Sequence, residues 1–213
     1  MLKFPRRFCL DSRPRFRRGF TMIELMIGMA LMAILITLAV PNFALWIRNL
    51  GIRGAAESIL SGLQLTRAEA LKRNTTMHFQ LTDTLDDGCV LDSAGPHWIV
   101  SRDSAAGECG AALSDEDFPH LVRTHDGKQA GGNKTIIAAD ASLFTFNGLG
   151  RLTTPAASKT VINVYGADGA DDCVPPTGGK ETRCLRVEIN SGGNIRMCDP
   201  ALSGDAQACG GTN

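Results

Sequence analysis

The residues of this chain that could take part in chemistry form no recognised catalytic set. The sequence contains no GxSxG nucleophile motif, no HExxH zinc motif and no Walker-type glycine loop. The four histidines are His78, His97, His120 and His125, and only the neighbouring pair His120 and His125 approaches the spacing of a metal site. The sequence therefore predicts that the protein is not an enzyme and needs no metal or other cofactor.

Cationic side chains gather near the C-terminus, where they could bind phosphate groups. The segment 180–196 contains four basic residues (Lys180, Arg183, Arg186 and Arg196) and two acids (Glu181 and Glu188). Cations on a hairpin can contact nucleic-acid phosphates in a way that depends on salt and not on base sequence. The alternative is an ordinary exposed strand with scattered charges. The hypothesis of DNA binding rests on Arg183, Arg186 and Arg196.

The charges are unevenly distributed along the chain. The 22 basic and 22 acidic residues give no net charge, but residues 1–19 hold seven basic residues and one acid, which leaves a balance of −6 in the remainder. This distribution excludes a uniformly basic nucleic-acid binder, and 44% hydrophobic against 21% charged residues excludes a disordered chain. The 23 glycines, nine prolines and 6% aromatic residues indicate a loop-rich body that contains β-structure.

A long uncharged segment, residues 25–47, follows the basic N-terminus. At a rise of ~1.5 Å per residue, a helix of this length would cross a hydrocarbon layer ~30 Å thick. A buried core helix is the alternative, although cores seldom need so long a run without charge. The basic residues before the segment place residues 1–19 in the cytoplasm and the chain after Ile47 outside it. We expect one membrane span, N-in and C-out, rather than a cleaved secretory signal.

Six of the seven cysteines follow this segment, in the part predicted to lie outside the cytoplasm. They are Cys89, Cys109, Cys173, Cys184, Cys198 and Cys209. An even number in such a compartment predicts disulfides, and six cysteines allow about 15 pairings. Short loops favour the pairs Cys89–Cys109, Cys173–Cys184 and Cys198–Cys209, while the other pairings stay open. The spacings contain no CxxC, which argues against a zinc or dithiol-redox site.

Residues 17–25, Arg-Arg-Gly-Phe-Thr-Met-Ile-Glu-Leu, combine a basic pair, a glycine, a phenylalanine and one acid at the start of the apolar run. This pattern resembles the class III signal of type IV pilins and type II secretion pseudopilins. In that family a prepilin peptidase cuts after the glycine on the cytoplasmic face. The resemblance implies cleavage between Gly19 and Phe20, retention of the apolar segment and methylation of Phe20. Cys9 would leave with the leader.

Two residues near or within the apolar segment are expected to act in assembly. A carboxylate such as Glu24 costs ~2.5–3.5 kcal/mol at full membrane depth, so it is either paired or close to the interface. The resemblance supplies a partner, the charged amino group of Phe20 in a neighbouring subunit; a solvated edge charge is the alternative. Pro41 lacks a backbone N–H, so the helix should kink or loosen there. Similar pilins carry a proline at this point, which implies local melting in the filament.

Residues 48–74 predict an amphipathic helix that closes at Asn74. Its apolar stripe comprises Ile52, Ala55, Ala56, Ile59, Leu60, Leu63, Thr66, Ala70 and Leu71. The sequence of residues 64–74, Gln-Leu-Thr-Arg-Ala-Glu-Ala-Leu-Lys-Arg-Asn, is similar to the helix end of the GspH/FimT branch of the family.

Beyond residue 74, short β-type runs alternate with turn residues. The predicted strands are 77–81, 98–102, 121–123, 135–138, 143–146, 160–165, 184–189 and 194–198. The turn 190–193 joins the last two as a hairpin, and the loops 103–118 and 167–181 are expected at the surface. The predicted fold is α+β and type IV pilin-like: a long N-terminal helix packed on an antiparallel β-sheet head with disulfides.

The C-terminal hairpin offers a second resemblance. Residues 193–200, Gly-Asn-Ile-Arg-Met-Cys-Asp-Pro, resemble the GRxR-type element of FimT-like minor pilins, which is linked in that group to DNA capture during natural transformation. Asn194 replaces the first arginine of the element, so one of its cations is missing.

The sequence thus predicts four segments: a leader, 1–19; a transmembrane and assembly half of the helix, 20–47; an amphipathic half, 48–74; and a periplasmic β-rich head, 75–213. We expect a minor pilin or pseudopilin of the GspH/FimT type, stored in the bacterial inner membrane and assembled into a type IV pilus or a type II secretion pseudopilus. Expected partners are other minor and major pilins or pseudopilins, prepilin peptidase and the inner-membrane assembly platform. The alternative is a DNA-binding minor pilin at a pilus tip.

Overall fold

The computed structural model describes residues 19–128, 135–166, 173 and 183–209, and only the backbone of residues 38–42. The basic residues of the leader and the cation Lys180 lie outside the described residues. The chain divides into two compact units, Met1–Asn42 and Phe43–Asn213, and each is described by itself. Helix α1 (Met22–Arg73) runs through both units, and all the described strands belong to the second.

The C-terminal end of α1 is closed by a backbone motif. Asn74 adopts a φ of 48°, in the left-handed region that asparagine tolerates better than most residues. Its N–H donates to the carbonyl of Leu71 at 3.3 Å. The N–H of Thr75 donates to the carbonyl of Ala70 at 3.2 Å. These two bonds form a Schellman motif, which ends the helix at Arg73.

In the first unit, α1 exposes its apolar side chains. Every side chain from Met22 to Thr37 is exposed, and the exposed fractions of the large apolar ones range from 53% for Ile36 to 85% for Met22. These side chains are not buried by any described part of the chain. Among the described residues, no helix has a stretch that is both long and apolar enough to cross a membrane.

In the second unit, α1 buries one stripe of side chains. The fully buried members of the predicted stripe are Ile52, Ala55, Ala56, Ile59, Leu63, Thr66 and Ala70. Leu60 is only half-buried, and Leu71 is 49% exposed, contrary to the prediction that it lies in the stripe. Leu71 lies in the last turn of α1 and borders the tight turn at Gly150 instead of a strand.

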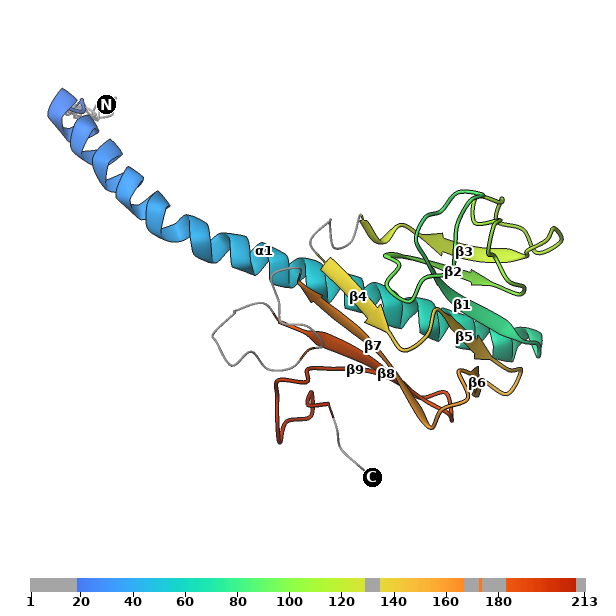
Figure 1. Ribbon diagram of the computed structural model, residues 1–213. Coiled ribbons are helices and arrows are strands. Elements are labelled where there is room, and N and C mark those ends of the chain that lie inside the picture. Colours follow the sequence, from blue (N-terminus) through green and yellow to red (C-terminus); the bar gives the residue numbers. More distant parts are fainter. Residues whose placement is uncertain (1–18, 129–134, 167–172, 174–182, 210–213) are drawn as a thin grey trace, which may run out of the picture. The chain divides into compact units, whose positions relative to one another are not determined.

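The described strands form two antiparallel sheets. The first sheet has the order β3-β2-β1-β5-β6 and the second the order β4-β7-β8-β9. The bounds are β1 (Met77–Thr82), β2 (His97–Ser101), β3 (Leu121–His125), β4 (Thr135–Ala139), β5 (Leu143–Phe146), β6 (Leu152–Thr154), β7 (Lys159–Gly166), β8 (Leu185–Asn190) and β9 (Ile195–Cys198). Within the second unit, both sheets lie along the C-terminal half of α1 (Figure 1).

One apolar core joins the buried stripe of α1 to both sheets. Phe79 and Phe144 from the first sheet and Val187 from the second are fully buried in this core. The helix approaches the first sheet at Gly62, where an added Cβ would lie 2.7 Å from Phe79 Cε2 and 3.1 Å from ring carbons of Trp98. A glycine is therefore required at this crossing, although it lowers the helix propensity of the segment.

This architecture confirms the predicted fold class, since a long helix packs on antiparallel β-structure that contains disulfides. The described strands form two sheets, whereas the sequence predicts a single sheet. Strand β6 was not predicted, because it has only three residues between the turn at Gly150 and the breaker Pro155. Chain order alone does not show that β5 returns to pair with β1.

Candidate functional site

The predicted cleavage site lies directly before α1. Gly19 and Phe20 are both exposed, and the Phe20 side chain is 84% exposed. Thr21 then caps the helix, because its Oγ1 accepts the backbone N–H of Glu24 at 3.2 Å. The Thr-x-x-Glu spacing is that of a capping box, and an acid in the first turn complements the helix dipole. Thr21 is therefore the capping residue, and the Glu24 carboxylate complements the helix dipole in addition to any role in assembly.

Pro41 lies inside α1, and the boundary between the two compact units follows one residue later, after Asn42. The helical backbone is assigned without a break through this position. The kink expected at Pro41 remains a prediction.

Three disulfides join the six cysteines of the head. The pairs are Cys89–Cys109, Cys173–Cys184 and Cys198–Cys209. Each bond joins neighbours in cysteine order, as the short-loop argument favours. The closed loops have sequence separations of 20, 11 and 11 residues. Loops of this size correspond to a few kcal/mol each through the entropy of the unfolded chain.

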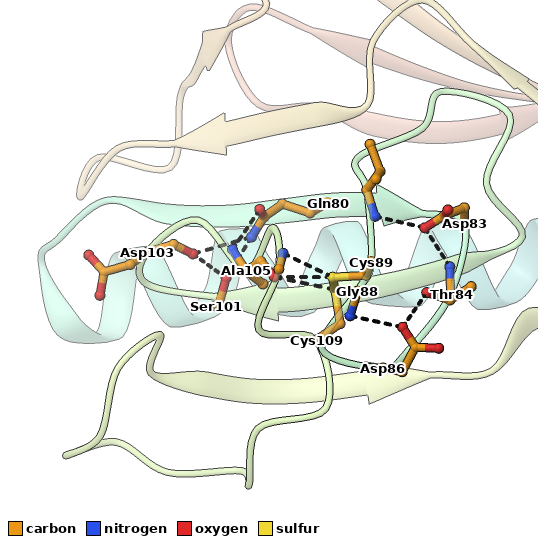
Figure 2. Close-up of a disulfide and its surroundings, with 12 residues drawn as sticks. Gln80, Asp83, Thr84, Asp86, Gly88, Cys89, Ser101, Asp103, Ala105 and Cys109 are labelled. Atoms are coloured by element: carbon orange, nitrogen blue, oxygen red, sulfur yellow. Dashed lines mark hydrogen bonds between the residues drawn. A yellow bond between two sulfur atoms is a disulfide. The ribbon is translucent and has the colours of Figure 1, made fainter.

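The first disulfide lies beside a buried polar network (Figure 2). Gln80 of β1 is fully buried, and its Nε2 donates to Ser101 Oγ at 2.7 Å and to the Asp103 carbonyl at 3.2 Å. Its Oε1 accepts the N–H of Ala105 at 3.0 Å. Gln80 therefore fixes the backbone that leads into Cys109, and its own buried polar atoms have partners.

This network corrects the prediction that the whole loop 103–118 lies at the surface. Ala105 and Cys109 of the loop are buried together with Cys89, Ile99 and Leu121 in a second, smaller core. The loop is anchored because a disulfide and a buried glutamine hold its first half. Its second half remains exposed, as at Phe118. Most of the other predicted surface loop, 167–181, lies outside the described residues.

The three arginines of the DNA hypothesis have different surroundings. Arg186 Nε donates to Asn163 Oδ1 on β7 at 2.8 Å. Arg196 donates through Nε and Nη2 to one carboxylate oxygen of Glu188, at 2.9 and 2.7 Å. Arg183 lies just before β8, where its backbone N–H donates to Asn49 Oδ1 of α1 at 3.1 Å.

Glu188 is the centre of the cationic hairpin. It is 3% exposed and forms ion pairs with Arg196 of β9 and Lys159 of β7. Burial raises the pKa of Glu188, but the hydrogen bonds from Lys159 and Arg196 outweigh burial and hold this pKa below its usual value. The hairpin turn at 190–193 sets a register in which Glu188 faces Arg196. The sequence therefore contained a signal for this pair.

One face of the second sheet is charged and the other is buried. In antiparallel sheets, residues directly opposite each other share a face. The pairings Asn163↔Arg186 and Glu188↔Arg196 place these residues on the outer face. Lys159 lies on the same face, because it is two residues from Val161, which pairs with Glu188. The outer face thus carries three cations around one buried acid.

Arg67 joins α1 to a turn that is distant in sequence. Its Nε donates to the Gly150 carbonyl at 3.1 Å, across 83 residues. Gly193, at φ 81° in the β8–β9 turn, lies against the same carbonyl, since an added Cβ there would be 1.9 Å from the Gly150 oxygen. The sequence indicates no function for Arg67, because no local pattern points to a partner so far along the chain.

The described residues provide no open set of metal ligands. Within the described part of the chain, the group with closely spaced ligand atoms comprises Glu188, Cys198 and Cys209, but the two sulfurs form a disulfide and Glu188 is ion-paired. His120 and His125, the pair considered from the sequence, have separate partners. His120 pairs with Asp103, and His125 stacks on Trp98 with ring centroids 5.0 Å apart.

Comparisons with known proteins give two family matches. The family model described as Type II transport protein GspH matches residues 55–193, and that of the prokaryotic N-terminal methylation motif matches residues 14–40. No curated protein matches the chain.

Among solved structures, the chain is similar to the type IV minor pilin FimU of Pseudomonas aeruginosa strain PAO1 in two crystal forms. The first has 16% identity and a TM-score of 0.47, covering 71% of this chain and 90% of that chain. The second has 16% identity and a TM-score of 0.45, covering 70% and 94%.

Proposed function

The chain belongs to the GspH family of pilin and pseudopilin subunits, and on this basis we propose that it is a minor subunit without enzymatic activity. Prepilin peptidase removes the leader between Gly19 and Phe20, and the mature chain enters a type IV pilus or a type II secretion pseudopilus. There it supports pilus biogenesis or protein secretion. The N-terminal methylation motif supports processing at this site.

One observation carries the proposal: the first half of α1 is apolar and exposed. Its large apolar side chains are more than half exposed, whereas the second half of the same helix buries its stripe in the head. Apolar area exposed on this scale favours association with lipid or with other helices. Packing of these helices against one another would hold the subunits together in a fibre.

Before assembly, we place this half of the helix in the inner membrane. The support is the run of 23 uncharged residues, 25–47, preceded by seven basic residues. This arrangement puts the leader in the cytoplasm, where prepilin peptidase reaches Gly19, and the disulfide-bonded head in the periplasm. The partners are other minor and major pilins or pseudopilins and the inner-membrane assembly platform.

The first experiment tests processing. Mass spectrometry of the chain recovered from cells should find a mature N-terminus at methylated Phe20. Gly19→Leu places a bulky side chain at the scissile bond and should leave the full-length precursor. The matched control, Gly28→Leu, makes the same change in α1 beyond the bond and should still be cut. A mature form that begins elsewhere, or lacks the apolar segment, would contradict the proposal.

The second experiment tests Glu24. Glu24→Gln keeps the size of the side chain but cannot compensate the amino group of Phe20 in a neighbouring subunit. This variant should be processed normally yet enter fibres several-fold less than the native chain, as measured by immunoblots of sheared fibres. Glu57→Gln, at an exposed acid of the same helix, is the control and should assemble normally. Normal incorporation of Glu24→Gln would leave Glu24 with only its favourable position in the first turn of α1.

A second candidate function, DNA capture at a pilus tip, is supported by Arg186 and Arg196 on the outer face of the second sheet and by Arg183 just before β8. If it is correct, charge reversal at Arg183, Arg186 and Arg196 should abolish retention of DNA by the full chain in detergent. The same reversal at Arg123, an exposed cation of the first sheet, is the control. Retention that survives the triple reversal would exclude this function.

A further inference from the structure

A pocket of about 530 Å³ lies at the N-terminal end of the second unit. One wall comes from the first turns of this unit's part of α1, and the opposite wall from the chain around β8 and β9. The lining residues that matter here are Trp46, Leu50 and Arg53 of α1, and Arg183, Met197 and Asp199 opposite. The volume is within the range of small-molecule sites, ~300–1,000 Å³.

Two arginines line this pocket, one on each wall. Arg183 is held in place by the hydrogen bond from its backbone to Asn49, and no acid among the described residues forms an ion pair with its side chain. Arg53 pairs with Glu57 at 2.7 Å, but both side chains are at least half exposed. Such a pair contributes only ~0–1 kcal/mol, so another anion can replace the carboxylate at little cost.

The remaining lining gives the pocket a mixed character. Asp199 is the acid among the described lining residues, and its Oδ1 accepts the N–H of Ala201 at 2.9 Å. Among the lining residues that the structure describes, two cations and one anion leave one net positive charge. Trp46, Leu50 and Met197 add apolar surface beside the cations. The pocket therefore suits an anionic group attached to hydrocarbon better than a free, fully hydrated ion.

The position of the pocket along α1 matches a membrane surface. Asn49 and Arg53 follow Ile47, the last residue of the uncharged run, by two and six residues, or about 3–9 Å of helix rise. The polar headgroup layer on each side of the hydrocarbon core is about 5–7 Å thick. Trp46 is 56% exposed at this level, where tryptophan is typical of the membrane interface.

We propose that this pocket binds the phosphate of an anionic membrane lipid while the subunit is stored in the membrane. Arg53 and Arg183 contact the phosphate from opposite sides, and Trp46, Leu50 and Met197 contact the glycerol and the first acyl carbons. The inference rests on the proposed function, because it requires residues 25–47 to be in the bilayer. A subunit that leaves for the fibre would have to release this lipid.

The test uses the full chain with Trp98→Phe, which leaves Trp46 as its one tryptophan. The chain is reconstituted in vesicles that contain brominated phosphatidylglycerol or, at the same mole fraction, brominated phosphatidylcholine. Quenching of Trp46 should report about fivefold enrichment of phosphatidylglycerol, since ~1 kcal/mol is typical for one cationic charge near an anionic surface. Arg53→Gln with Arg183→Gln should remove the enrichment, and Arg123→Gln should keep it.

Equal quenching by the two lipids, or enrichment that persists in the double variant, would overturn the inference. Saturable binding of inorganic phosphate or a short DNA duplex to the chain in pure phosphatidylcholine, without a preference for phosphatidylglycerol, would also overturn it. If Trp98→Phe fails to fold, the lipid that copurifies with the native chain from mixed membranes gives the same ratio. If alkaline pH extracts the chain from the vesicles, the chain does not span the bilayer, which contradicts the proposed function itself. If the chain is retained but shows no lipid preference, only this inference is contradicted.

Discussion

The two halves of α1 contain the same kinds of side chain in opposite environments. Leu31 in the first half is 58% exposed, whereas Leu63 in the second half is fully buried. The first half is apolar on all sides, and the second is apolar along one stripe. A stripe indicates a helix with one protein partner, while apolar residues on all sides indicate a helix surrounded by lipid or by other helices. The distribution of apolar residues around the helix therefore indicates their surroundings better than their number does.

The largest contrast should come from the same truncation in each half. Leu63→Ala opens a cavity between α1 and the sheets and should lower the free energy of unfolding of the head by ~2–5 kcal/mol. Leu31→Ala removes the same atoms from an exposed site and should leave that free energy unchanged. Urea denaturation of the full chain in detergent, followed by tryptophan emission, measures both. Equal losses in the two variants would show that the halves do not differ as described.

A smaller contrast should come from the two glycines. Gly62→Ala forces a Cβ against Phe79 and Trp98, at a cost of ~1–3 kcal/mol that the gain in helix propensity, ~1 kcal/mol, offsets only in part. Gly28→Ala meets no atom within 4 Å, and its gain in helix propensity is confined to the first unit. Thermal unfolding of the head should therefore shift down for the first variant and stay unchanged for the second. A higher melting temperature for Gly62→Ala would mean that the crossing is looser than these distances require.

The smallest effect should be a pH dependence confined to the head, since every histidine of the chain lies there. Burial lowers the pKa of His97 and, with a smaller contribution from Arg123, that of His125; the Asp126 carboxylate opposes both shifts. Between these lowered values and about 6.5, the unfolded chain binds more protons, so the head loses stability as pH falls below about 6.5.

Denaturation of the head at a series of pH values measures this dependence, and the helicity of the detergent-bound first half should not change. His97→Gln should flatten the profile of stability against pH. Arg151→Gln changes an exposed residue that is not a histidine, so it should leave this profile unaltered. A profile that rises as pH falls below 6.5 would contradict the assigned direction of the pKa shifts.

Local patterns in the sequence were enough to predict α1 and every described strand except β6. The helix end at Asn74, the strand at 143–146 and the C-terminal hairpin all depend on neighbouring residues, and the structure contains each of them. Pairings between distant segments were beyond such patterns. The return of β5 to β1, the Arg67–Gly150 bond and the burial of Ala105 under Gln80 each need residues that are far apart in the chain.

The candidate site shows the same division between local features, which the sequence predicts, and contacts between distant residues, which it does not. The cleavage motif, the cysteine order and the positions of the arginines could be read from the sequence. The environment of each arginine could not, except for Arg196, whose partner Glu188 follows from counting across the hairpin turn. Glu24 shows the converse, because its capping by Thr21 was visible in the Thr-x-x-Glu spacing but was overlooked beside its cost in a membrane.

The contact of Arg67 with Gly150, beside Gly193, has a mechanical consequence. A fibre transmits tension from subunit to subunit through its helices, so a pull on this head would enter along α1. Arg67 binds the turn between β5 and β6, which touches the turn between β8 and β9, and the N–H of Leu152 donates to the Ser191 carbonyl beside it. Traction on the helix would therefore reach both sheets through this contact as well as through the shared core, and neither sheet would be peeled away alone.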